Sequence, residues 1–140
     1  MIIYTRGIAL DPPPYSLEKL RAIGVPSGVI DYVIISHCHG DHDAGALQII
    51  LDHNKVEVIS TPTIMGSFLR KYTAITNISI TNLKKLFVFR PIKIGAPLHL
   101  NGAVFKFDYS LHSIPCLCFS VKFNNKSIFF SGDTLYDPPR

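Results

Sequence analysis

The sequence predicts an α/β (α+β layered) fold that forms a single domain over residues 1–140. Helix-like and strand-like patterns alternate up to about residue 86, and strand-like patterns dominate the remainder. The apolar run at residues 32–35 is typical of a strand that is buried on both faces. Hydrophobic residues make up 47% of the chain and charged residues 17%, so a disordered chain is excluded.

The first half is expected to alternate strands and helices. Asp11 and the prolines at 12–14 end the first strand, and Thr61 with Pro62 provides a cap and a first turn for a helix. In chain order, the expected elements are a strand at 7–10, a helix capped by Ser16 and ended by Gly24, a strand at 32–35, a helix around 46–51, a strand at 56–59, a helix over 61–72 and a helical piece at 83–86.

The second half is expected to be β-rich. The expected strands lie at 87–89, 98–100, 104–107, 117–123 and 127–130. Asn124 and Asn125 are expected to join the last two strands through a hairpin turn, because asparagine tolerates the backbone angles that such turns need. The loops at the strand ends are then available for a functional site.

Four side chains of metal-ligand type lie within one hexapeptide, H-x-H-x-D-H, at His37, His39, Asp41 and His42. Residues two apart in an extended segment point the same way, so His37 and His39 can bind one metal ion together. A tight turn at Gly40 is expected to direct Asp41 and His42 toward a neighbouring position. Imidazole and carboxylate ligands suit zinc, iron or manganese and do not suit calcium.

Two further residues are expected to complete the site. His112 follows a predicted strand, and Asp133 follows the strand at 127–130, where its carboxylate is well placed to bridge two cations. His53 and His99 have no ligand-type neighbours in the sequence, so we interpret them as structural or solvated histidines.

The three cysteines and one basic pair are not expected to take part in metal binding. Cys38 alternates with two predicted ligands and is expected to pack away from the metal, and Cys116 and Cys118 are expected to pack in a strand. Three cysteines are too few for a disulfide scaffold, so a reducing, cytoplasmic location is expected. We interpret the pair Arg70 and Lys71 as a solvated helix face.

Taken in order, the H-x-H-x-D-H motif at 37–42, His112 and the Ser-Gly-Asp-Thr segment at 131–134 resemble the metallo-β-lactamase-fold hydrolases. This resemblance covers nearly the whole chain and implies an αβ/βα sandwich with metals between two β-sheets. It implies as metal ligands His37, His39 and His112 for the first ion, Asp41 and His42 for the second, and Asp133 as the bridge between them. It also implies two zinc ions in the complete domain, with iron or manganese as alternatives.

The sequence departs from that family at its end. The family supplies a further histidine from a segment beyond the Gly-Asp-Thr element, but no histidine follows His112 before the last residue, Arg140. We therefore expect a truncated or abbreviated member that is incomplete at the C-terminus. A weakened second metal site, and an inactive fragment, follow from that expectation.

The expected reaction is hydrolysis by a metal-bound hydroxide, since a bound metal lowers the pKa of water to near neutrality. Asp41 is the natural carboxylate to orient the hydroxide and to take up a proton. No serine or cysteine is paired with a base in a recognisable motif, so a covalent nucleophile is not indicated.

The expected substrate class is inferred from two short segments of the sequence. Residues 112–119 resemble the phosphodiesterase and RNase Z branch of the superfamily, whereas residues 132–136 resemble the glyoxalase II-like thioesterases. The net charge of +4 weakly favours a phosphate-bearing substrate. We expect a phosphodiester of the cyclic-nucleotide or nucleic-acid type, with thioester hydrolysis as the alternative.

Other outcomes stay open from the sequence alone. A non-catalytic or redox module of the same fold is the alternative from a different class. The expected partner is a small-molecule or nucleotide phosphodiester, and nucleic acid and a homo-oligomer also remain open. No membrane partner is expected, because the sequence has no apolar stretch long enough to span a bilayer.

Overall fold

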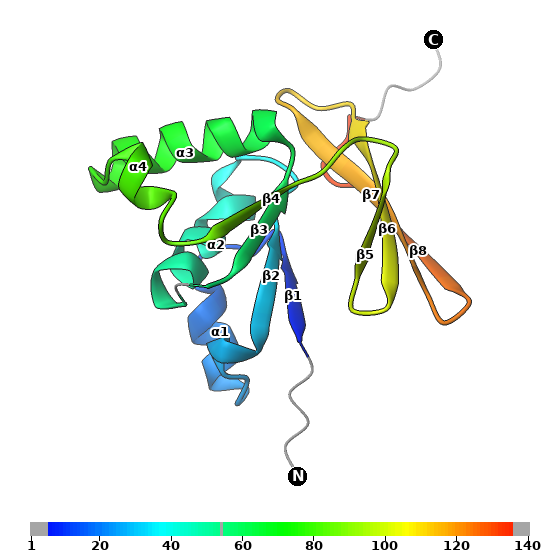
Figure 1. Ribbon diagram of the computed structural model, residues 1–140, viewed down its shortest axis with the longest axis horizontal. Helices are drawn as coiled ribbons and strands as arrows, with labels where there is room; N and C mark the ends of the chain where they lie inside the picture. Colours follow the sequence, from blue (N-terminus) through cyan, green and yellow to red (C-terminus); the bar gives the residue numbers. More distant parts are fainter. Residues whose placement is uncertain (1–5, 54, 136–140) are drawn as a thin grey trace. The chain divides into compact units, whose positions relative to one another are not determined.

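The structure is a computed structural model that describes residues 6–53 and 55–135 (Figure 1). The chain divides into two compact units, Met1–Pro91 and Ile92–Arg140. Each unit is built around one four-stranded sheet, so the predicted mixture of an α/β half and a β-rich half is confirmed.

The first unit contains a parallel sheet and its connecting helices (Figure 1). The strands are β1 (Gly7–Leu10), β2 (Ile30–Ile34), β3 (Glu57–Ser60) and β4 (Val88–Pro91). The helices are α1 (Ser16–Ala22), the short 3-10 helix η1 (Ser27–Val29), α2 (Gly40–Asp52), α3 (Pro62–Thr76) and α4 (Ile80–Leu83). The strands pair in sequence order, and right-handed crossovers in that order place the connecting helices on one face of the sheet.

The core of this unit lies between the sheet and those helices. Val33, Ile34 and Val58 are fully or almost fully buried in the strands, and Ile49 and Phe68 are fully buried on the helices. The confirmed cap of α3 fits this packing: the Thr61 hydroxyl accepts a hydrogen bond from the Ile64 amide at 3.3 Å, and Pro62 occupies the first turn.

The strand register brings polar residues to one edge of the parallel sheet. Leu10 of β1 pairs with Ile34 of β2, and Ile34 pairs with Ile59 of β3. The residues that follow these strands therefore emerge side by side, among them Asp11 and Ser36. Ligand sites of open α/β sheets lie at this carboxyl edge.

The second unit is an antiparallel meander of four strands (Figure 1). They are β5 (Pro97–Leu100), β6 (Ala103–Ser110), β7 (Cys116–Phe123) and β8 (Lys126–Phe130). Phe107 and Phe119 are buried on neighbouring strands with their ring centres 5.1 Å apart. The hairpin at Asn124 and Asn125 is confirmed, and both residues have the positive φ angles, 46° and 61°, that a type I′ turn requires.

Three details of the predicted elements are wrong. The helix α2 begins at Gly40, inside the motif, so no tight turn separates Gly40 from the helix. Ser16 is the first residue of α1 and not its cap; its hydroxyl donates to the Pro13 carbonyl at 2.5 Å. The helical piece expected at 83–86 is instead α4, which ends at Leu83.

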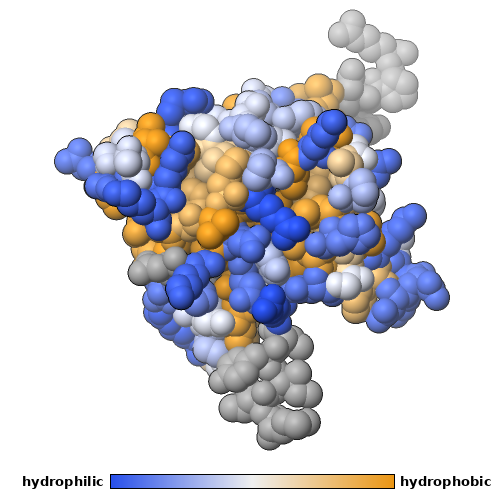
Figure 2. All heavy atoms as spheres, in the orientation of Figure 1, coloured by the Kyte–Doolittle hydropathy of each residue, from blue (hydrophilic) through white to orange (hydrophobic). Residues whose placement is uncertain are grey.

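Apolar side chains also reach the surface, as Figure 2 shows by the orange areas between charged ones. On the second unit, Ile128 and Phe129 of β8 are 69% and 67% exposed. Within the part of the chain that the structure describes, no helix has the length and apolar character needed to cross a membrane.

Candidate metal centre

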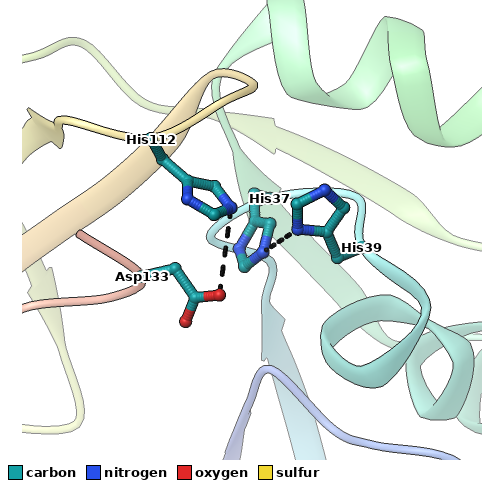
Figure 3. Close-up of side chains that lie close together, drawn as sticks. All are labelled: His37, His39, His112 and Asp133. Carbon is teal, nitrogen blue, oxygen red and sulfur yellow. Dashed lines mark hydrogen bonds and ion pairs between the residues drawn. The ribbon is translucent and has the colours of Figure 1, made fainter. Parts of the chain in front are cut away.

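The first half of the candidate site is the segment between β2 and α2. His37 is fully buried and His39, which is the N-cap residue of α2, is half-buried. The Nε2 atom of His37 lies 3.1 Å from the Nδ1 atom of His39 (Figure 3). Two nitrogens that share a tetrahedral zinc ion at about 2.1 Å lie about 3.4 Å apart, so the two rings converge as a pair of ligands would.

A chain of hydrogen bonds from Asp11 through Ser36 holds the His37 ring at its Nδ1 atom. The Ser36 amide donates to Asp11 Oδ1 at 2.7 Å, and the Ser36 hydroxyl donates to Asp11 Oδ2 at 2.5 Å. The same hydroxyl oxygen lies 2.9 Å from His37 Nδ1. Because the hydroxyl proton is directed to Asp11, the oxygen accepts from an Nδ1–H of His37. That tautomer leaves a lone pair on Nε2, the nitrogen that faces His39.

Asp11 is a residue of the candidate site that sequence reasoning missed. Its backbone is in the left-handed region, with φ of 41°, and its side chain is buried beyond the end of β1. Burial raises the pKa of the Asp11 carboxyl, and the hydrogen bonds from Ser36 act in the opposite direction. The available signal was an aspartate directly after an apolar strand, at a position that the sequence pattern indicated only as the end of that strand.

The remaining residues of the motif lie in the first turn of α2. His42 Nδ1 is 3.1 Å from Asp11 Oδ2, and Asp11, His37 and His42 each offer a ligand atom within 4.8 Å of the others. The Asp41 side chain is 77% exposed, and its Oδ2 lies 3.6 Å from His42 Nε2. The structure thus gathers His42 with Asp11 and His37, and leaves Asp41 at the surface beside them.

The second unit carries the other two predicted ligands. His112 lies in the loop after β6, Asp133 follows β8, and His112 Nε2 is 3.8 Å from Asp133 Oδ2 (Figure 3). Two contacts join the segments that carry them: Ser110 Oγ donates to the Asp133 carbonyl at 2.8 Å, and the Leu135 amide donates to the Leu111 carbonyl at 2.7 Å. The loops therefore hold an imidazole and a carboxylate together.

Gly132 makes that approach feasible. Its φ is +61°, and a Cβ atom there would collide with the Leu117 carbonyl oxygen. Tyr136, which belongs to the thioesterase-like segment, lies outside the described residues.

Cys38, in the first unit, does not have the properties of a metal ligand. Its Sγ donates to the Ile64 carbonyl at 3.4 Å, and burial raises the pKa of the thiol to about 12. Metal ligation requires the thiolate. The packing interpretation of Cys38 therefore agrees with the structure. The donors of the candidate ligands are imidazole and carboxylate groups, which fit zinc, iron or manganese.

Comparison with known proteins places these residues in a family context. A profile of the family described as "Anti-Pycsar protein Apyc1" matches residues 5–140. Among curated proteins, the cGMP-dependent 3',5'-cGMP phosphodiesterase A of Dictyostelium discoideum is 50% identical over 138 residues, which are 99% of this chain and 16% of that protein. The cAMP/cGMP-dependent 3',5'-cAMP/cGMP phosphodiesterase B of the same organism is 40% identical over 131 residues, 94% of this chain and 12% of that protein.

The comparison with solved structures concerns the fold. The metallo-β-lactamase fold protein YhfI from Bacillus subtilis matches with a TM-score of 0.73 and 18% identity, over 94% of this chain and 52% of that chain. The predicted metallo-β-lactamase-like fold is thereby confirmed. The chain spans about half the length of that structure and a much smaller share of the two phosphodiesterases.

Proposed function

Because the chain belongs to the anti-Pycsar protein Apyc1 family, we propose that it forms part of a metal-dependent hydrolase that cleaves the 3',5'-phosphodiester of a cyclic nucleotide. The observation that carries the proposal is the 50% identity, over 99% of this chain, to a 3',5'-cGMP phosphodiesterase. The converging imidazoles of His37 and His39 support the metal-dependent part.

The proposed ligands are those that the sequence indicates. His37, His39 and His112 would hold the first ion, Asp41 and His42 would serve the second, and Asp133 would serve both. The support is the donor chemistry of each unit and the order of these residues in a chain with the metallo-β-lactamase fold. We also propose that residues 1–140 belong to a single metallo-β-lactamase-like domain. Zinc is the proposed metal, and iron and manganese fit the same donors.

The chain's own residues would have distinct tasks in the reaction. When bound, the metal ions supply Lewis acidity that activates water and stabilises charge on the phosphate. Ser36 and Asp11 hold the His37 ring with Nε2 available for ligation. Asp41, exposed in the first turn of α2, would accept the proton released from the attacking water at its carboxylate.

The test is hydrolysis by the full-length protein after metal removal and after return of zinc or manganese. Cyclic GMP and bis(p-nitrophenyl) phosphate are compared with a lactoylglutathione thioester. We expect cleavage of the phosphodiesters only in the metal-loaded protein, and Asp41→Ala to lower kcat by about 10²–10⁴-fold. Asp108→Ala, at an exposed position of β6, is the matched control and retains activity.

Three outcomes would contradict the proposal. Cleavage of the thioester with the phosphodiesters untouched would establish the alternative substrate class. Absence of zinc, iron and manganese binding would indicate a non-catalytic module. Oxygen consumption by an iron-loaded protein would indicate a redox module. We also propose a cytoplasmic location, on the basis of three cysteines that form no disulfide in the described residues.

A further inference from the structure

The ammonium group of Lys71, on α3, joins the motif segment to α2. Its Nζ donates to Asp43 Oδ1 at 2.6 Å and Oδ2 at 2.9 Å, and to the Cys38 carbonyl oxygen at 3.0 Å. An ammonium group carries three protons, so each proton has an acceptor. Lys71 was interpreted from the sequence as part of a solvated helix face, and that interpretation is wrong.

Asp43 anchors this group. Its side chain is fully buried, whereas that of Lys71 is 28% exposed. The Tyr72 hydroxyl donates to Asp43 Oδ1 at 2.7 Å, and burial raises the pKa of Tyr72, so that the hydroxyl keeps its proton. A buried carboxylate requires a paired cation and satisfied oxygens. The Lys71 ammonium is thereby held at a fixed place in the unit.

This fixed ammonium acts on the backbone beside His39. Cys38 lies between His37 and His39, and its carbonyl oxygen belongs to the peptide that precedes His39. On the other side, the His39 carbonyl oxygen accepts from the His42 amide at 3.0 Å and the Asp43 amide at 3.2 Å. Because peptide units are planar, the two peptide planes that flank the His39 Cα are both held in place. The direction in which the His39 side chain leaves the backbone follows from them.

We propose that Lys71 is a positioning residue of the metal centre, which, through the Cys38 carbonyl and Asp43, keeps His39 Nδ1 directed toward His37 Nε2. The inference rests on the proposed function, since it takes His37 and His39 as metal ligands. Lys71 acts through the backbone and not on the substrate.

Electrostatics provides a way to separate positioning from a simple effect of charge. A positive charge near a cation site weakens cation binding, so removing Lys71 would strengthen zinc binding if Coulomb repulsion alone mattered. Loss of positioning has the opposite sign, because a misdirected imidazole binds zinc less tightly. When Lys71 and Asp43 are replaced together the net charge is kept, so electrostatics alone predicts little change and a loss of zinc affinity identifies a loss of positioning.

The experiment measures the zinc dissociation constant of the chain by competition with a chromophoric chelator. The double variant Lys71→Met/Asp43→Asn leaves no unpaired buried charge, keeps the net charge, and removes the donor from the Cys38 carbonyl. We expect its dissociation constant to rise about 10–100-fold, the usual effect of losing a residue that orients a ligand, while the melting temperature of the metal-free protein stays near that of the wild type. Arg70→Met removes a positive charge from the adjacent, exposed position and is expected to bind zinc as the wild type does or more tightly.

The outcomes are distinguishable. Unchanged zinc affinity in the folded double variant would overturn the role of Lys71 and leave the proposed function intact. A wild-type chain that binds no zinc would instead defeat the proposed function. Equal weakening by Arg70→Met would also overturn the positioning role. If the double variant shows no thermal transition, Lys71→Met/Asp43→Val replaces the pair by apolar side chains, which is often neutral for folding, and the same criterion applies.

Discussion

A single hydroxyl group, that of Ser36, lies between the buried carboxylate of Asp11 and the Nδ1 atom of His37. Ser36→Ala removes that link, so the His37 ring loses the acceptor that fixes its tautomer and orientation. We expect zinc affinity to fall by about 10–100-fold, as for other partners that orient a metal ligand. The measurement is a zinc titration of the metal-free variant against a competing chelator.

Ser60→Ala is the matched control for this substitution. The Ser60 hydroxyl is also buried and donates to the Ile35 carbonyl at 2.8 Å, one strand away from Ser36. Both substitutions remove a buried hydrogen bond, and each is expected to lower the free energy of unfolding by about 1 kcal/mol. Zinc affinity should change only for Ser36→Ala. Equal losses of zinc affinity would mean that general destabilisation, and not the orientation of His37, is the cause.

At the same scale, spacing along the chain predicted some residues and missed others. His37 and His39 are two residues apart, so an extended backbone alone brings their rings to one side. Asp11 contacts Ser36 across 25 residues, and Lys71 contacts Asp43 across 28. These contacts depend on the parallel sheet and on the packing of α3 against α2. A lysine beside an arginine on an amphipathic helix has the pattern of a surface residue, and its buried partner lies on another helix.

Among the elements, α2 depends on a close approach that only glycine allows. The Gly45 amide donates to the Pro12 carbonyl at 2.9 Å, and an added Cβ would lie 2.5 Å from that oxygen and also collide with the Pro13 carbonyl oxygen. We expect Gly45→Ala to lower the free energy of unfolding by about 1–3 kcal/mol, because α2 must move away from these prolines. Chemical denaturation measures the change.

Gly66→Ala, in the interior of α3, is the matched control with the opposite expected sign. A Cβ there would meet only the flexible end of Arg70, at 3.5 Å. Alanine is a better helix former than glycine, so we expect stabilisation of up to about 1 kcal/mol. If Gly45→Ala also stabilised the protein, the close contact between α2 and the proline segment would be refuted.

The boundaries of the elements were harder to predict than their existence. Apolar runs identified the strands, and the Thr61-Pro62 pair identified the start of α3. The start of α2 carries no Ser, Thr, Asp or Asn cap, because His39 occupies that position. Amides of the first turn bond to the His39 carbonyl instead, so the helix begins within the motif without the usual sequence signal.

For the whole molecule, the predicted fold class is confirmed, and the arrangement of two sheets in two compact units follows the change of pattern near residue 86. The candidate ligands divide between the units: His37 and His39 belong to the first, and His112 and Asp133 to the second. Sequence order and the family resemblance predicted this set, whereas local periodicity could not, since no local pattern relates two loops some 70 residues apart. The proposal assigns all of them to one set of metal ligands.

Zinc binding by the 140-residue chain tests that central proposal most directly. The zinc dissociation constant is measured for the wild type and for His37→Ala, His112→Ala and His99→Ala, the last of these at an exposed position of β5. The proposed set of metal ligands predicts that His37→Ala and His112→Ala each weaken binding by about 100-fold or more, and that His99→Ala leaves it unchanged. Wild-type affinity in His112→Ala, or no zinc binding by the unaltered chain, would contradict the account.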